Sequence, residues 1–137
     1  MKNYVFNYKD SEGNEKEVAL RLTSMDCENI ENQYNCSLIT YVQQPSITTL
    51  INLLMYMRKG AGENFTKNMA YSFYDELVDC GYTIESILME IIYPALVVSG
   101  VLSEEDFKEI KEERNKLKNM TAEEKKEMIK ERKNLQK

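Results

Sequence analysis

The chain has 137 residues, of which 42% are hydrophobic and 30% charged, and its net charge is −5. This composition is typical of a soluble globular domain with a strongly polar part, and the negative charge means that a nucleic-acid partner would need a local basic patch. The sequence contains no His, which removes the commonest general base and the commonest zinc ligand.

The first 22 residues predict a β-hairpin. Apolar side chains alternate on either side of the turn-forming sequence DSEGNE, first Tyr4, Phe6 and Tyr8 and then Val18, Leu20 and Leu22. An isolated hairpin is only marginally stable in water. We therefore expect these side chains to pack on helices or on strands of another chain.

Two helices are predicted next. Thr23 or Ser24 can cap a helix through MDCENIENQY, and Asn35 is a plausible stop. A short helical segment, SLITYVQQ, follows and should end at Pro45.

The clearest helix is a central one beginning after its cap, Ser46, and ending at Gly60. Its apolar face is Ile47, Leu50, Ile51, Leu54 and Met57 or Met55. A further helix, capped by Thr66 and closed by Gly81, places Met69, Phe73, Leu77 and Cys80 on one face.

The segment from Cys80 to Leu102 is the most apolar part of the chain. A membrane-spanning helix needs about 20 predominantly apolar residues, and Glu85, Glu90 and Pro94 interrupt this run. We therefore expect no membrane association but a core helix, capped by Thr83 and kinked or divided at Pro94.

The composition changes at Ser103. The residues beyond it include ten acidic and eleven basic side chains, a net charge of +1, which leaves −6 for residues 1–102. Thr121 opens a TAEE capping box, and a thin apolar seam contains Phe107, Ile110 and Leu117. The predicted fold is mainly α (α+β): a hairpin and compact helical body over residues 1–102, then a charged helical tail over residues 103–137.

No catalytic, cofactor-binding or metal-ligating residues are predicted, and no enzyme is expected. Cys27, Cys36 and Cys80 lack CxxC spacing and a His partner, so we interpret them as free thiols. No phosphate-binding glycine motif is present. The acidic residues Asp75 and Glu76 lie on a helix, where carboxylates usually face solvent.

Composition and residue spacing do not by themselves identify a binding partner. The tail's Lys and Arg residues are interleaved with Glu, which argues against nucleic-acid binding. The N-terminal sequence MKNYVFNYKD has no apolar leader region, so we expect a cytoplasmic protein. A small regulatory or nucleic-acid-binding helical protein of a mobile element stays as an alternative.

Several segments, taken in order, resemble tail assembly chaperones of long-tailed phages and prophages of Gram-positive bacteria. They are EVALRLTSMDCENIENQYNCSLITYV, PSITTLINLLMYMRKG and FYDELVDCGYTIESILMEIIYPALVVSGVL, and the resemblance covers roughly residues 16–107. It implies a non-enzymatic protein of the bacterial host cytoplasm, without a cofactor. Such proteins coat the tape-measure protein and keep it soluble until the tail tube polymerises, and they are absent from the mature virion.

A protein that coats apolar helices of a tape-measure protein must cover them reversibly, and reversible cover requires many moderate contacts. We expect a homo-oligomer, a ring or spiral, whose subunits associate through Tyr4, Phe6 and Tyr8 on a strand with a free edge. For the tape-measure client we expect exposed parts of the helices over residues 46–59 and 84–102 and of the tail. The candidate client-binding residues are Leu54, Met57, Ile91, Val98, Phe107 and Ile110.

Overall fold

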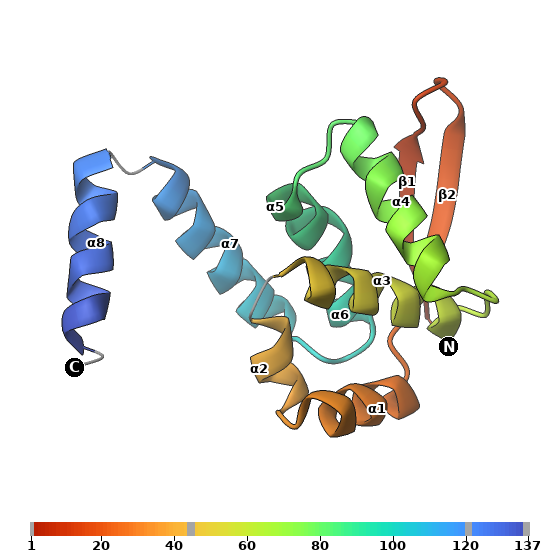
Figure 1. Cartoon of the computed structure of the whole chain (residues 1–137), viewed down its shortest axis with the longest axis horizontal. Coiled ribbons are helices and arrows are strands. Elements are labelled where there is room, and N and C mark those ends of the chain that lie inside the picture. The colour runs from red at the N-terminus through yellow and green to blue at the C-terminus, as the bar shows by residue number, and fades with distance from the viewer. Residues whose placement is uncertain (1, 44–45, 120–121, 136–137) are drawn as a thin grey trace. The chain divides into compact units, whose positions relative to one another are not determined.

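The computed structural model describes residues 2–43, 46–119 and 122–135 (Figure 1). It confirms a mainly helical fold with an N-terminal two-stranded hairpin. The elements are β1 (Tyr4–Lys9), β2 (Glu15–Leu20), α1 (Ser24–Tyr34), α2 (Leu38–Val42), α3 (Ile47–Gly60), α4 (Lys67–Asp79), α5 (Ile84–Ile87), the π-helix η1 (Leu88–Ile92), α6 (Tyr93–Val98), α7 (Glu104–Asn119) and α8 (Ala122–Leu135). They form two compact units, a body (Met1–Ser103) and a tail (Glu104–Lys137).

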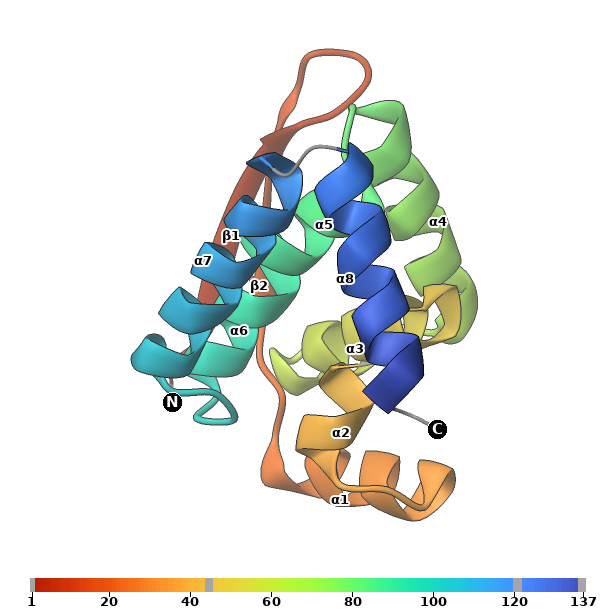
Figure 2. The same cartoon turned by 90° about the vertical axis from the view of Figure 1, so that its left-hand side faces the viewer.

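The hairpin has the predicted faces. Its antiparallel register pairs Phe6 with Val18 and Tyr4 with Leu20. The side chains of Phe6, Val18 and Leu20 are buried together with Tyr8. A tight turn joins the strands, because the Asp10 carboxylate accepts two backbone N–H groups and Gly13 takes a left-handed conformation with φ of 84°. This turn lies at the opposite end of the body from α1 and α2 (Figures 1 and 2).

In the described part of the chain, the helix caps are the ones that the sequence predicts. Thr23, Ser46, Thr66 and Thr83 each accept a backbone N–H of the first turn of their helix. Asn35 ends α1 in the left-handed conformation. The predicted helix end at Pro45 and the capping box at Thr121 fall outside the described residues.

Helix α3 is the centre of the body. It contacts β2, α4 and η1, and Leu50, Ile51, Leu53, Leu54 and Met57 have no exposed surface. The expected single apolar face was therefore too narrow a description, because neighbours cover α3 on several sides.

Helix α3 ends at Gly60, as predicted, and this glycine also permits a close approach of the chain. It is the last residue of α3, and the Arg21 N–H donates to the Met57 carbonyl at 2.8 Å close by. A Cβ atom on Gly60 would lie 2.0 Å from the Arg21 carbonyl oxygen. Gly60 is thus required by the close approach of the chain after β2 to the end of α3.

Helix α4 exposes more than its sequence pattern suggested. Ala70, Phe73 and Leu77 are buried, whereas Met69, placed on the same face by the periodicity, is 44% exposed. Cys80 is partly exposed, and it is a free thiol like Cys27 and Cys36.

Pro94 divides the apolar run, as predicted, and a hydroxyl from β1 compensates for it. Pro94 has no N–H to donate to the carbonyl of Glu90, four residues earlier. The chain widens into η1, in which the Tyr93 N–H bonds the Leu88 carbonyl. The Glu90 carbonyl accepts the Tyr4 hydroxyl at 2.7 Å, which ties the hairpin to this helix.

The apolar run contributes to the core, since Ile87, Leu88, Ile91, Ile92 and Leu96 are buried. Within the described residues, no single helix is long and apolar enough to cross a membrane. The pair Lys67–Asp79 and Ile84–Val98 passes that test only jointly, with a bend of 113° between its members.

The tail consists of α7 and α8. Phe107, Ile110 and Leu117 are half-buried, and the Lys111 ammonium lies 4.3 Å from the centre of the Phe107 ring. On α8, Ile129 is exposed. The helical content expected of the tail is present in its described part.

Candidate protein-binding groove

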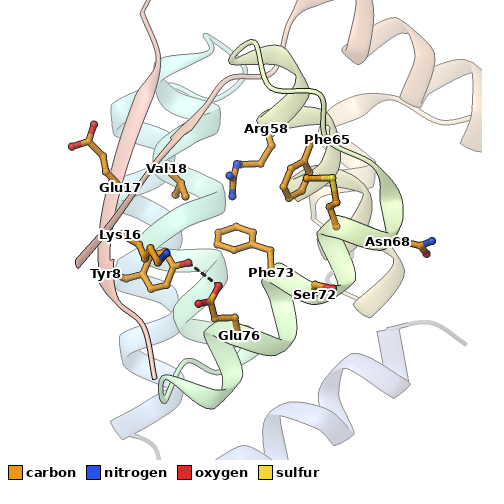
Figure 3. Close-up of a pocket in the computed structure, with 11 residues that line it drawn as sticks. Tyr8, Lys16, Glu17, Val18, Arg58, Phe65, Asn68, Ser72, Phe73 and Glu76 are labelled. Carbon is orange, nitrogen blue, oxygen red and sulfur yellow. Dashed lines mark hydrogen bonds between the residues drawn. The ribbon is translucent and has the colours of Figure 1, made fainter. Parts of the chain in front are cut away.

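A groove of about 500 Å³ opens between the hairpin and α4 (Figure 3). We call it the β2–α4 groove. Its lining residues are Tyr8, Lys16, Glu17, Val18, Arg58, Phe65, Asn68, Met69, Ser72, Phe73 and Glu76. They come from both strands, the end of α3, the loop after it and α4.

The floor of the groove is aromatic. The rings of Phe65 and Phe73 meet edge to face with centroids 6.4 Å apart, and the Tyr8 ring lies 6.0 Å from Phe73. Phe65 immediately precedes the Thr66 cap of α4, and Phe73 lies two turns further along the helix. The capped start of α4 therefore fixes both rings beside the strands.

Arg58 covers these rings at one end of the groove. Its guanidinium carbon lies 4.4 Å from the centre of Phe65 and 4.9 Å from that of Phe73, a distance at which a cation is attracted to an aromatic face. The same guanidinium donates two hydrogen bonds to the Glu63 carboxylate, from Nε at 3.1 Å and from Nη2 at 2.7 Å. Arg58 is thus held in place, and its charge is compensated within the chain.

At the other end, Tyr8 and Glu76 join the hairpin to α4. The Tyr8 hydroxyl donates to Oε2 of Glu76 at 3.0 Å, the dashed line in Figure 3. Burial of the phenol, followed by this hydrogen bond, raises the pKa of Tyr8 above its ordinary value. The hydroxyl is therefore protonated at neutral pH and serves as a donor rather than as a base.

The rim is mixed in character. Met69 is 44% exposed, and Asn68 and Ser72 continue the α4 side of the groove (Figure 3). On the strand side, Lys16 and Glu17 are exposed. An aromatic floor with an exposed thioether and a few polar groups at the rim is suited to binding an apolar side chain of another molecule.

The groove brings together few groups that could perform chemistry. Within the part of the chain that the structure describes, no three His, Cys, Asp or Glu side chains are placed to hold a metal ion. Of the two acidic residues considered from sequence, Glu76 accepts a hydrogen bond from the Tyr8 hydroxyl, and Asp75 is exposed. What the groove offers is shape, apolar surface and charge.

The residues predicted for self-association are largely used inside the chain. Phe6 and Tyr8 are 7% and 8% exposed, and the Tyr4 hydroxyl is bonded to the Glu90 carbonyl. Of the three, Tyr8 lines the groove. The inner face of the hairpin packs on its own helices, so another subunit can reach the strand edges or the outer face.

The residues predicted for client binding divide into two groups. Leu54, Met57 and Ile91 are completely buried in the core, because helices and strands enclose α3 and η1. They are not part of a binding surface in this conformation, and that part of the prediction is corrected. Val98 is 39% exposed, and Phe107 and Ile110 are half-buried on α7.

Sequence reasoning did not find the groove. The periodicity placed Met69 and Phe73 on one face of a helix, but it does not show that Phe65, Arg58 and the strands lie beside that face. The available signal was local: an aromatic residue directly before a capping Thr, with another aromatic seven residues after that Thr. That spacing indicates two rings on one side of α4 but does not specify what faces them.

We compared the chain with models of known protein families, with curated proteins and with solved structures, and none of the three comparisons found a significant match. The interpretation of the groove therefore depends on its geometry and on the segments described above.

Proposed function

We propose that the protein is a tail assembly chaperone of a long-tailed phage or prophage, which binds apolar helical segments of the tape-measure protein and keeps them from aggregating. The observation that carries this proposal is the β2–α4 groove, a hollow of about 500 Å³ with a largely buried aromatic floor and the exposed Met69 side chain at its rim. We infer the client, the tape-measure protein, from the resemblance of several segments, taken in order, to tail assembly chaperones.

The shape of the groove supports a helical client. Helix-in-groove recognition places the apolar stripe of an amphipathic helix along a hydrophobic channel. Phe65 and Phe73 supply a rigid floor, and Met69 supplies an adaptable edge that can fit different apolar side chains. Adaptable contacts suit a chaperone that must bind many sites along a long client and later release them.

Charge argues for a protein client over a nucleic acid. Glu76 brings a carboxylate to the groove, and Arg58 is already paired with Glu63. Phosphates would be repelled by such a surface. The net charge of −6 over residues 1–102 also disfavours the alternative of a nucleic-acid-binding regulatory protein.

Assembly of several subunits remains part of the proposal, through backbone edges instead of the side chains of Tyr4, Phe6 and Tyr8. The Asp10 N–H bonds the Asn14 carbonyl across the hairpin. Backbone groups alternate in direction along an antiparallel strand, so those of Val5, Asn7 and Lys9 point away from β2. They form a free edge on which another subunit can pair.

The test is co-expression with an apolar helical fragment of a tape-measure protein, followed by separation of soluble and pelleted material. We expect the fragment to stay soluble with the wild-type chain and with Tyr71→Gln, and to pellet with Met69→Gln. Met69 and Tyr71 are equally exposed, at 44%, but Tyr71 is not in the groove. The substitution Met69→Gln also completes a capping box with Thr66, so the fold is retained.

The proposal fails if the fragment pellets equally with and without the wild-type chain. It also fails if both substitutions leave the fragment equally soluble, since the groove would then not be the client site.

A further inference from the structure

We propose that Arg58 is an autoinhibitory cover of the β2–α4 groove. In the free chain its guanidinium lies on the aromatic floor, and an apolar side chain of the client displaces it into solvent. This inference rests on the proposed function and adds how the groove is closed before a client arrives.

Arg58 hides the two rings that could hold an apolar side chain. Phe65 and Phe73 both line the groove, but each is only 5% exposed. The guanidinium carbon of Arg58 lies 4.4 Å from the centre of the Phe65 ring and 4.9 Å from that of Phe73. The Arg58 side chain extends into the groove toward Phe73 (Figure 3). Part of the cover over the floor is therefore a single side chain, which can move without a change of the backbone.

The attachment of this cover is local and partly solvated. Glu63, five residues away, accepts two hydrogen bonds from the guanidinium, and its side chain is 41% exposed. Water and salt weaken an ion pair that has an exposed partner. The loop between α3 and α4 also has a backbone hydrogen bond of its own, from the Glu63 N–H to the Arg58 carbonyl at 3.2 Å. Arg58 can thus leave the rings while the fold around them persists.

An arginine suits both states of the groove. Its planar guanidinium stacks on aromatic faces, and its charge keeps an otherwise apolar hollow from associating with other molecules. A long side chain can also carry its charge into water while its methylene groups stay on apolar surface. An apolar client side chain gains contact with the rings when it expels the guanidinium, and the returning guanidinium promotes release of the client. A competing group within the chain thus keeps binding moderate and reversible.

The experiment uses the full chain and one synthetic amphipathic peptide of about 20 residues, long enough for substantial helix formation. The polar positions of the peptide are uncharged, and binding is measured by fluorescence anisotropy. Arg58→Gln removes the guanidinium and should bind the peptide about tenfold more tightly than the wild type does. Glu63→Gln keeps the guanidinium but removes its ionic partner, and should bind about threefold more tightly.

A matched control and a salt series separate the cover from general charge. Lys59→Gln makes the same change of charge at the same end of α3, but Lys59 is exposed and lies outside the groove; it should bind as the wild type does. At about 1 M salt the affinities of Glu63→Gln and the wild type should converge, because screening already weakens the ion pair in the wild type. A merely structural role of Arg58 predicts the opposite sign, weaker binding by Arg58→Gln.

The position of the Arg58 side chain is read directly by NMR. In the free chain the ring currents of Phe65 and Phe73 should shift the signal of the Arg58 Nε–H, and Arg58→Gln assigns that signal by its loss. Saturation with the peptide should move the signal to the position of a solvent-exposed arginine.

Equal or weaker peptide binding by Arg58→Gln and Glu63→Gln would overturn the inference while leaving the client proposal to the co-expression test. Equally tight binding by Lys59→Gln would also overturn it, because general charge would then be the cause. An Arg58 signal that stays in place in the complex, or a peptide that binds none of the chains, would overturn it as well, even if co-expression keeps the tape-measure fragment soluble.

Discussion

Helices α3 and α4 are neighbours of similar length, and both have amphipathic sequences, but other elements enclose α3 and leave α4 partly exposed. α3 is enclosed by β2, α4 and η1, and its central residues from Leu50 to Leu54 are all buried. α4 buries Ala70, Phe73 and Leu77 on one side and leaves Met69 exposed at the groove. The enclosed helix stabilises the body, and the partly open helix is the one to which we assign client binding.

We therefore expect the residues of α3 to determine stability and the exposed residues of α4 to determine binding. A substitution on the enclosed helix should lower stability, whereas one on the open side of α4 should change binding. The following experiments test whether stability and binding depend on different residues.

The largest effect is expected on α3. Leu54→Ala removes a completely buried side chain and should lower the free energy of unfolding by about 2–5 kcal/mol. Met69→Ala on α4 should change it by less than about 0.5 kcal/mol. Urea denaturation followed by circular dichroism measures both, and comparable losses would show that α4 is as enclosed as α3.

A nearly equal loss is expected at the end of α3. Gly60→Ala places a Cβ atom 2.0 Å from the Arg21 carbonyl oxygen, and relieving this clash requires backbone movement. We expect a cost of about 1–3 kcal/mol. Lys59→Ala, next to it but exposed, is the control and should stay within about 0.5 kcal/mol. A neutral Gly60→Ala would contradict the close approach of the chain after β2.

A smaller effect is expected where α4 meets the hairpin. Tyr8→Phe removes the hydrogen bond to Glu76 and should cost about 1 kcal/mol near neutral pH. Because the pKa of Tyr8 is raised in the folded state, its contribution is complete below pH about 10 and is lost as the pH rises beyond that value. The wild type should thus lose more stability than Tyr8→Phe in alkaline urea titrations; parallel curves would refute this assignment.

The smallest change in stability should accompany a clear change in assembly. Asn7→Pro removes an N–H that points away from β2, so the hairpin is retained while the free edge is blocked. Ser11→Pro is the matched control, since Ser11 follows Asp10 in the turn, where Pro is accepted. In sedimentation velocity the control should associate with rising concentration as the wild type does, and Asn7→Pro should remain monomeric. A strictly monomeric wild type would contradict assembly through this edge.

Local sequence signals predicted the elements well, because caps, turns and alternation are short-range effects. Thr23, Ser46, Thr66 and Thr83 were identifiable as caps, since each precedes an amphipathic segment. The hairpin faces followed from the alternation of apolar side chains along β1. Pro94 predicted an interruption of the helix, but the sequence does not show that the Glu90 carbonyl accepts a hydroxyl from Tyr4, 86 residues earlier in the chain.

The candidate site could not be predicted from local sequence signals, because it is formed by the packing of several elements. Periodicity gives one apolar face per helix, so Leu54 and Met57 could be read as a surface, whereas β2 and η1 cover them. The same periodicity placed Met69 on one face with Phe73 and Leu77, which are buried, whereas Met69 is 44% exposed at the groove. Which faces are covered depends on how elements distant in sequence come together.

The most direct test of the account is site-specific photo-crosslinking in cells that co-express a tape-measure fragment. A photoreactive phenylalanine analogue at position 69 should form a crosslink to the apolar stripe of the fragment, as identified by mass spectrometry. The same analogue at position 71, which is equally exposed but outside the groove, should form none. Crosslinks from position 71 without crosslinks from position 69 would contradict the assignment of the β2–α4 groove to the client.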